Sequence, residues 1–182
     1  MSRAFFNDPL LEYMVPDDEK RLKFGDWFFG KTIGYCQRWG EVYADENLVG
    51  GGAWLSPGNT TITTMRILRA GMWKLPFKLG LSAMSRFNKL DNETTRVHKN
   101  LAPGDHWYLL LLGVDPANQN TGIGSAGIEV GAAKARQAGL PVYLETTTQS
   151  NVDYYMKRGF EIGEEFDIDG QLHTWAMVRP PS

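Results

Sequence analysis

A strand, a glycine-rich turn and a helix follow one another between residues 107 and 138. Residues 107–114 (WYLLLLGV) form an apolar run bounded by turn signals, which predicts a buried strand. A small-residue helix is predicted over 122–138, ending at Gly139. The first N–H groups of such a helix have no partner inside it, so they can bind an anion. The segment therefore predicts a phosphate-binding turn.

Two common phosphate loops fit this turn poorly. A P-loop has Lys followed by Ser or Thr after its last glycine, and here Ser125 and Ala126 follow. Residues 122–127 have the Gly-x-Gly-x-x-Gly spacing of a dinucleotide site. However, Glu145 matches the expected acidic residue poorly, and no series of βαβ units follows. A tight turn that binds nothing explains the loop equally well.

The next elements favour a binding function. Residues 141–146 (PVYLET) are predicted as a strand, and residues 151–158 as a short helix. We expect Asn151 to be the N-cap of that helix and Gly159 to end it.

Residues 109–160 resemble the GNAT acyltransferase superfamily. Its first hallmark, Gln/Arg-x-x-Gly-x-Gly/Ala, is met by residues 119–124 (QNTGIG). Its second, an Asn and then a Tyr four residues before a Gly-Phe pair, is met by residues 151–160 (NVDYYMKRGF). Residues 42–54 and 141–146 look most like the branch that contains puromycin N-acetyltransferase.

The resemblance implies an α+β GNAT fold in one domain, residues 1–182. Its central sheet is mixed, mostly antiparallel and flanked by helices, and strand 109–114 splays from strand 141–146. The family's first edge strand has no counterpart before residues 4–9, so either the gene start is set too late or the sheet lacks that strand. A missing strand would leave residues 41–45 as an open edge, which invites pairing into a homodimer.

Other elements follow from local signals. The sequence predicts helices within residues 3–30, one beginning at Asp8–Pro9 and the next at Asp17–Glu19. It also predicts a hairpin over 41–55, helices over 60–68 and 75–99 broken at Gly71 and Pro76, and a terminal hairpin over 160–178 with its turn at Asp169–Gly170.

The resemblance also implies acetyl-CoA as cosubstrate, with no metal. Backbone N–H groups of the loop would hold its pyrophosphate, and its thioester arm would pair with the backbone of Leu112 and Val114. Arg158 would contact the phosphates, or else is an ordinary cation at a helix C-terminus. The cofactor-binding residues expected on these grounds are Leu112, Gly113, Val114, Gln119, Asn120, Thr121, Gly122, Ile123, Gly124, Ser125, Asn151, Tyr154 and Arg158.

Tyr155 matches the family's general acid, which would protonate the departing thiolate. It would otherwise be a core tyrosine. Glu145 is the expected base, because it lies near the end of strand 141–146, although it could equally pair with a nearby arginine or a backbone group. His106 and His173 are weaker candidates, and a chain of waters would also serve.

Composition excludes several classes of protein. No apolar run of 18 residues exists and the start lacks a signal peptide, so we expect a cytoplasmic protein without membrane insertion. Cys36 is the only cysteine, and the three histidines are too scattered for a metal site. A formal net charge of −2 gives no sign of nucleic-acid binding.

Two surface patterns bear on the acceptor. Residues 66–89 hold six basic residues, no acidic ones and several aromatics, as in a membrane-surface helix or, more often, a domain helix with a solvated basic face. Its aromatics, with those of residues 27–29, would then flank the acceptor. An acidic run over residues 161–169 favours a cationic acceptor.

The function predicted from these features is an acetyl-CoA-dependent N-acetyltransferase acting on a primary amine of a small molecule. The amine would attack the thioester directly in a ternary complex, because Cys36 lies outside both motifs and has no His beside it in sequence. The alternative is a non-catalytic acetyl-CoA-binding sensor or regulatory module, since strand 107–114 lacks the carboxylate that many relatives place there.

Overall fold

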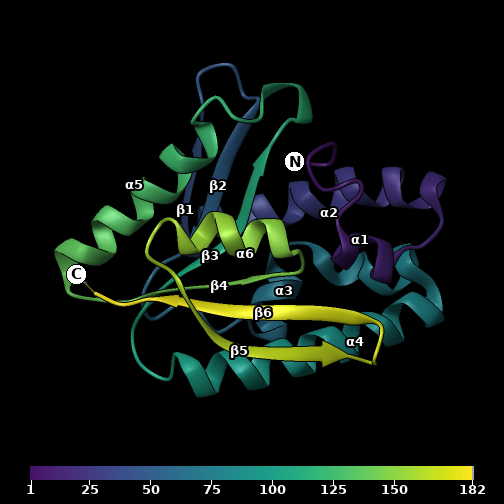
Figure 1. Cartoon of the computed structure of the whole chain (residues 1–182). Coiled ribbons are helices and arrows are strands. Elements are labelled where there is room, and N and C mark those ends of the chain that lie inside the picture. Colours follow the sequence, from purple (N-terminus) through teal and green to yellow (C-terminus); the bar gives the residue numbers. More distant parts are fainter. Residues whose placement is uncertain (182) are drawn as a thin grey trace.

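Six strands form one sheet, in the order β1-β2-β3-β4-β6-β5, in the computed structural model, which describes residues 1–181 (Figure 1). Neighbouring strands are antiparallel except β3 and β4, which are parallel. This confirms the predicted mixed, mostly antiparallel sheet. The strands are β1 (Gly40–Ala44), β2 (Gly50–Leu55), β3 (Trp107–Val114), β4 (Val142–Thr146), β5 (Glu161–Ile168) and β6 (Leu172–Arg179).

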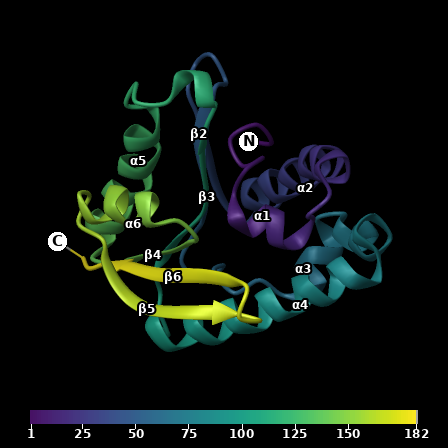
Figure 2. The same ribbon diagram turned by 45° about the vertical axis from the view of Figure 1, so that its right-hand side comes forward.

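Helices cover both faces of this sheet (Figure 2). The apolar sides of α5 and α6 pack on one face, while α1, α2 and α4 pack on the other. The helices are α1 (Pro9–Met14), α2 (Asp18–Trp39), α3 (Thr64–Arg69), α4 (Leu75–Leu101), α5 (Ile123–Ala138) and α6 (Gln149–Met156), with short 3₁₀ turns η1 (Met72–Lys74) and η2 (Pro116–Asn118).

The predicted starts of α1 and α2 are confirmed, because the Asp8 and Asp17 side chains accept hydrogen bonds from the first-turn N–H groups of the two helices. The prediction ended these helices by residue 30, whereas α2 continues to Trp39. Its buried side chains, among them Phe29 and Tyr35, pack into the core along that length. Tertiary burial therefore sets its length.

Helices α3 and α4 differ from their predicted bounds. The first begins after the N-cap Thr63 rather than at residue 60. Pro76 does not break α4, because a proline in the first turn removes no helical hydrogen bond. The interruption lies instead at Gly80, whose φ of 74° is not helical.

The parallel strands β3 and β4 diverge soon after they meet. They pair only at Trp107 with Val142 and at Tyr108 with Tyr143, whereas β3 stays paired with β2 as far as Val114. The predicted splay is confirmed. Beyond Tyr108, the β4 side of the β3 backbone has no partner strand within residues 1–181.

Strand β1 forms the edge of the sheet and pairs only with β2 in the described part of the chain. Lys134 from α5 forms an ion pair with Glu41 on this strand and lies 5.6 Å from the Tyr43 ring centroid. Within residues 1–181 no second strand pairs with β1, which is the open edge expected where the family's first strand is missing. Pairing of this edge with a second copy stays a prediction.

The basic segment over residues 66–89 divides between core and surface. Met72 and Leu75 are buried, whereas Phe77 is 85% exposed and Leu81 is 94% exposed. Among residues 1–181, no helix has the length and apolar character needed to cross a membrane.

We expect Leu144→Ala to lower the free energy of unfolding by about 2–5 kcal/mol, because Leu144 is buried at 1% exposure between β4 and the α5–α6 layer. Leu48→Ala makes the same truncation at 82% exposure and should change stability by less than about 0.5 kcal/mol. Chemical denaturation of both variants measures the difference, and equal effects would contradict this account of the core.

Candidate functional site

A cavity of about 250 Å³ lies where β3 and β4 diverge, and its lining comes from both faces of the sheet. Asn151 and Tyr155 of α6 line it from one face, and side chains of α1, α2 and α4 from the other. Residues 109–112 and 145–147 line the edges of the gap. We call this the through-sheet cavity. The gap between the two strands is therefore a space that both faces of the sheet share.

Glu145 lies in the wall of this cavity. The preceding residue, Leu144, points toward α5 and α6, so Glu145 points to the opposite face. There its carboxylate accepts hydrogen bonds from Tyr108 Oη at 2.5 Å and Tyr143 Oη at 2.9 Å. Burial raises the pKa of Glu145 to about 7, although the two phenol hydrogen bonds act to lower it. The group can therefore take up a proton near neutral pH.

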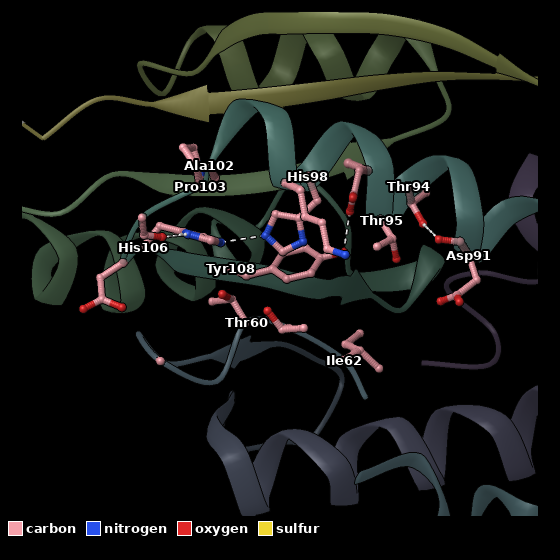
Figure 3. Close-up of a pocket in the computed structure, with 16 residues that line it drawn as sticks. Thr60, Ile62, Asp91, Thr94, Thr95, His98, Ala102, Pro103, His106 and Tyr108 are labelled. Atoms are coloured by element: carbon pink, nitrogen blue, oxygen red, sulfur yellow. Dashed lines mark hydrogen bonds between the residues drawn. The ribbon is translucent and has the colours of Figure 1, made fainter. Parts of the chain in front are cut away.

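A second cavity of about 380 Å³ adjoins the first, and we call it the polar cavity (Figure 3). Hydroxyl, imidazole and carboxylate groups line much of it. Tyr108 and Glu145 line both cavities, as do Ile62, Asp91 and Thr94. Glu145 therefore stands between the through-sheet cavity and the polar cavity.

Two histidines meet in the polar cavity (Figure 3). His98 Nε2 lies 2.7 Å from His106 Nε2, and His106 Nδ1 lies 2.7 Å from the Gly104 carbonyl. A carbonyl only accepts, so His106 carries its proton on Nδ1 and accepts from His98. Burial, together with His106, lowers the pKa of His98 to about 4, and burial also lowers that of His106. Both are neutral near pH 7.

This pair was not predicted from the sequence, where the histidines were considered as metal ligands and, for His106 and His173, as possible bases, but not as partners of one another. His98 lies before the end of α4 and His106 after it, and this spacing matches no recognised sequence motif. His106 lines the polar cavity but not the through-sheet cavity, and its free lone pair is taken by His98. His173 is exposed and hydrogen-bonded to Asp167. Neither His106 nor His173 lines the through-sheet cavity.

Tyr155 and Tyr154 point in different directions from α6, because adjacent residues of a helix lie about 100° apart around its axis. Tyr155 is 8% exposed and lines the through-sheet cavity, and burial raises the pKa of its phenol, which stays protonated. Tyr154 instead reaches the glycine loop, with its Oη 3.3 Å from Ser125 Oγ.

Asn151 is not the N-cap of α6, so that prediction is wrong. The helix starts two residues earlier than expected, and Thr148 Oγ1 accepts from the backbone N–H of Asn151. Asn151 is therefore in the first turn, and it lines the through-sheet cavity. Gly159, with φ of 78°, follows the helix as expected.

The start of α5 offers backbone N–H groups. Gly122 is its N-cap with φ of 91°, and no side chain within residues 1–181 caps it. Arg158 crosses from α6 and donates to Ser125 Oγ at 2.6 Å. Its guanidinium carbon lies 3.4 Å from the Tyr154 ring centroid. The helix start and a cation thus stand together, which favours an anion there.

The remaining predicted binding residues divide between loop and strand. Gln119, Asn120 and Thr121 are exposed in the loop. Leu112 lines the through-sheet cavity, whereas Gly113 is buried beneath the N-terminal residues, where an added Cβ would lie 2.9 Å from the Phe5 ring.

Two predictions about the acceptor had different outcomes. Phe87 of the basic segment lines the through-sheet cavity together with Phe28 and Phe29, as the aromatic pattern suggested, but Trp27, Trp73 and Phe77 do not. The acidic run over residues 161–169 lines neither cavity, so a cationic acceptor stays a prediction. Alternate residues of β5 face outward and others of the run bind side chains elsewhere, as Arg96 binds Glu164 and Lys89 binds Asp169.

Comparisons with known proteins agree with this geometry. The model of the Acetyltransferase (GNAT) family matches residues 3–160. An uncharacterized N-acetyltransferase of Schizosaccharomyces pombe is 30% identical over 190 residues, which cover 98% of this chain and 76% of that protein.

A crystal structure from Corynebacterium glutamicum, described as histone acetyltransferase HPA2 and related acetyltransferase, has the same fold. Its TM-score is 0.64 at 23% identity, over 99% of this chain and 86% of that one. With the splayed strands, the glycine loop and the family match in agreement, this chain belongs to the GNAT family of acetyltransferases.

Proposed function

We propose that this enzyme transfers an acetyl group from acetyl-CoA to the primary amine of a small molecule. The through-sheet cavity carries the proposal, because α6 lines it on one face and Glu145 lines it toward the other. The likeness to the branch that contains puromycin N-acetyltransferase belongs to the same proposal and agrees with a small acceptor.

Acetyl-CoA has a complementary place on the α5–α6 side. Its pyrophosphate would meet the N–H groups of residues 122–125 and the Arg158 guanidinium, both of which favour an anion. Its arm would run along the unpaired backbone of β3, at Leu112 and Val114, and Asn151 lies in the same cavity. This supports a thioester placed within the gap.

The reaction follows from the two titratable groups in the cavity. Glu145 accepts a proton from the ammonium, and the free amine attacks the thioester carbonyl carbon. The new C–N bond forms and the C–S bond breaks, and Tyr155 donates its proton to the departing thiolate. The amide nitrogen loses its remaining extra proton, which returns through water to the Tyr155 phenolate, so that both protons are accounted for. The products are an amide and CoA with a free thiol. Because Glu145 also lines the polar cavity, its proton can pass to water there.

Direct transfer is favoured over an acetyl-enzyme. Cys36 is fully buried, and burial raises its pKa to about 12, so it supplies no thiolate. It lines neither the through-sheet cavity nor the polar cavity. The amine must therefore meet the thioester in a ternary complex.

Gly122→Val should abolish acetyl-CoA binding, because a β-branched side chain opposes a φ of 91° and would stand where the pyrophosphate approaches. Gly139→Val is the matched control. It introduces the same strain at φ of 65°, with open space around it, at the far end of the same helix. Calorimetry should show binding lost only in the first variant, and unchanged affinity in a folded Gly122→Val would contradict the site.

Tyr155→Phe should retain acetyl-CoA binding but lower kcat by about 10²-fold, the lower end for general acid catalysis, because only the proton donor is removed. Tyr154→Phe removes a hydroxyl from the neighbouring residue outside the cavity and should leave kcat nearly unchanged. If both variants kept full kcat, Tyr155 would be a packing residue.

The rate at saturating substrates should rise with pH and level off above about 7, because Glu145 must be deprotonated to act and its pKa is about 7. Glu145→Gln should lower kcat and remove this step. Tyr143→Phe removes a hydrogen bond that stabilises the carboxylate, so the midpoint should move to higher pH.

The outcomes of this pH series separate catalysis from other functions. An unshifted midpoint in Tyr143→Phe, or an unchanged profile in Glu145→Gln, would assign the base elsewhere. A protein that binds acetyl-CoA but releases no thiol with any amine would instead be a non-catalytic sensor.

A further inference from the structure

The acceptor half of the through-sheet cavity is apolar and aromatic. Its rings are already arranged in pairs, with Phe5 and Phe29 centroids 4.9 Å apart and Phe28 and Phe29 centroids 5.5 Å apart. Such spacings are those that aromatic rings prefer, so a further ring fits this wall. Side chains lining this half include Leu11, Met14, Phe28, Phe29, Phe87 and Leu90.

Two buried hydroxyls in the same cavity lack partners. Tyr35 Oη and Thr174 Oγ1 have no hydrogen-bond partner among residues 1–181, although their residues are only 2% and 1% exposed. The Arg66 guanidinium donates to Asn59 and lies near enough to act as a donor toward Tyr35 Oη as well, but it cannot accept, so the phenol proton of Tyr35 is the part of this hydroxyl that lacks a partner. Buried polar groups are normally paired, so the pair indicates a ligand with a polar substituent.

The charged part of the cavity is small. Glu145 and Asp91 line its wall, and burial raises the pKa of both. Asp8 is already engaged, since its carboxylate accepts from the Leu10 N–H and from Thr147. One ammonium group can therefore be held near Glu145, with apolar surface beyond it.

We propose that the acceptor is a small aromatic primary amine that carries one hydrogen-bonding substituent. This rests on the acetyltransferase function proposed above and names the class of its second substrate. The amine lies against Glu145, the ring against the phenylalanines of α2 and α4, and the substituent against one of the two buried hydroxyls, that of Tyr35 or that of Thr174.

The same walls disfavour more polar acceptors. A linear polyamine or an amino sugar has polar groups along its whole length, and most of these would face apolar side chains without a partner. A cavity of about 250 Å³ is also smaller than the roughly 300–1,000 Å³ typical of sites for drug-sized ligands. The acceptor is therefore compact.

Initial rates of thiol release from acetyl-CoA would test this with four amines: 2-phenylethylamine, its ring-hydroxylated analogue tyramine, spermidine and glucosamine. We expect kcat/KM for the two aromatic amines to exceed that for spermidine and glucosamine by about tenfold or more. Tyramine should be the better of the two, because its hydroxyl gives one of the buried hydroxyls a partner.

Three variants test which side chains cause the preference for aromatic amines. Phe87→Ala should lower kcat/KM for the aromatic amines by about tenfold and leave KM for acetyl-CoA unchanged. Phe77→Ala makes the same truncation on the same helix, at 85% exposure, and should change neither value. The double variant Tyr35→Phe/Thr174→Val keeps the shape of both side chains and should abolish the preference for tyramine.

The outcomes distinguish the two proposals. A higher kcat/KM for spermidine or glucosamine would overturn the aromatic acceptor but leave the acetyltransferase function intact. Equal losses in Phe87→Ala and Phe77→Ala, or an unchanged tyramine preference in the double variant, would also overturn it. Thiol release with none of the amines, despite bound acetyl-CoA, would count against the acetyltransferase function itself.

Discussion

The site depends on the early divergence of the parallel strands β3 and β4. Two paired positions, ending at Tyr108 and Tyr143, hold the strands together at one end. Beyond them β3 stays paired with β2, while β4 stays paired with β6, so the gap between them is held open by the rest of the sheet. Without this gap no cavity would connect the two faces of the sheet.

The same two tyrosines that end the pairing also bind Glu145. Their hydroxyls hold the carboxylate at the base of the gap, and burial makes it a group that titrates near neutral pH. The position of the Glu145 carboxylate and the opening of the strands thus have a common structural origin. His98 stacks on Tyr143 with ring centroids 4.3 Å apart and continues the packed network into the polar cavity.

Local chemistry made much of the chain predictable. Asp8 and Asp17 begin their helices because a short acidic side chain can accept from first-turn N–H groups. The Asp169–Gly170 turn was predictable because both residues adopt positive φ there. Two predictions failed because residues outside the local pattern decided the outcome. Thr148, and not Asn151, caps α6, and burial of its side chains in the core extends α2 to Trp39.

The sequence by itself determined the family, the glycine loop and the candidate pair Tyr155 and Glu145, because these follow from spacing along one or two adjacent elements. Only the tertiary structure decided which groups surround that pair. The orphan hydroxyls of Tyr35 and Thr174, and the apolar wall from α1, α2 and α4, come from segments far apart in the chain. Their meeting depends on how the helices pack on the sheet, which no local pattern encodes.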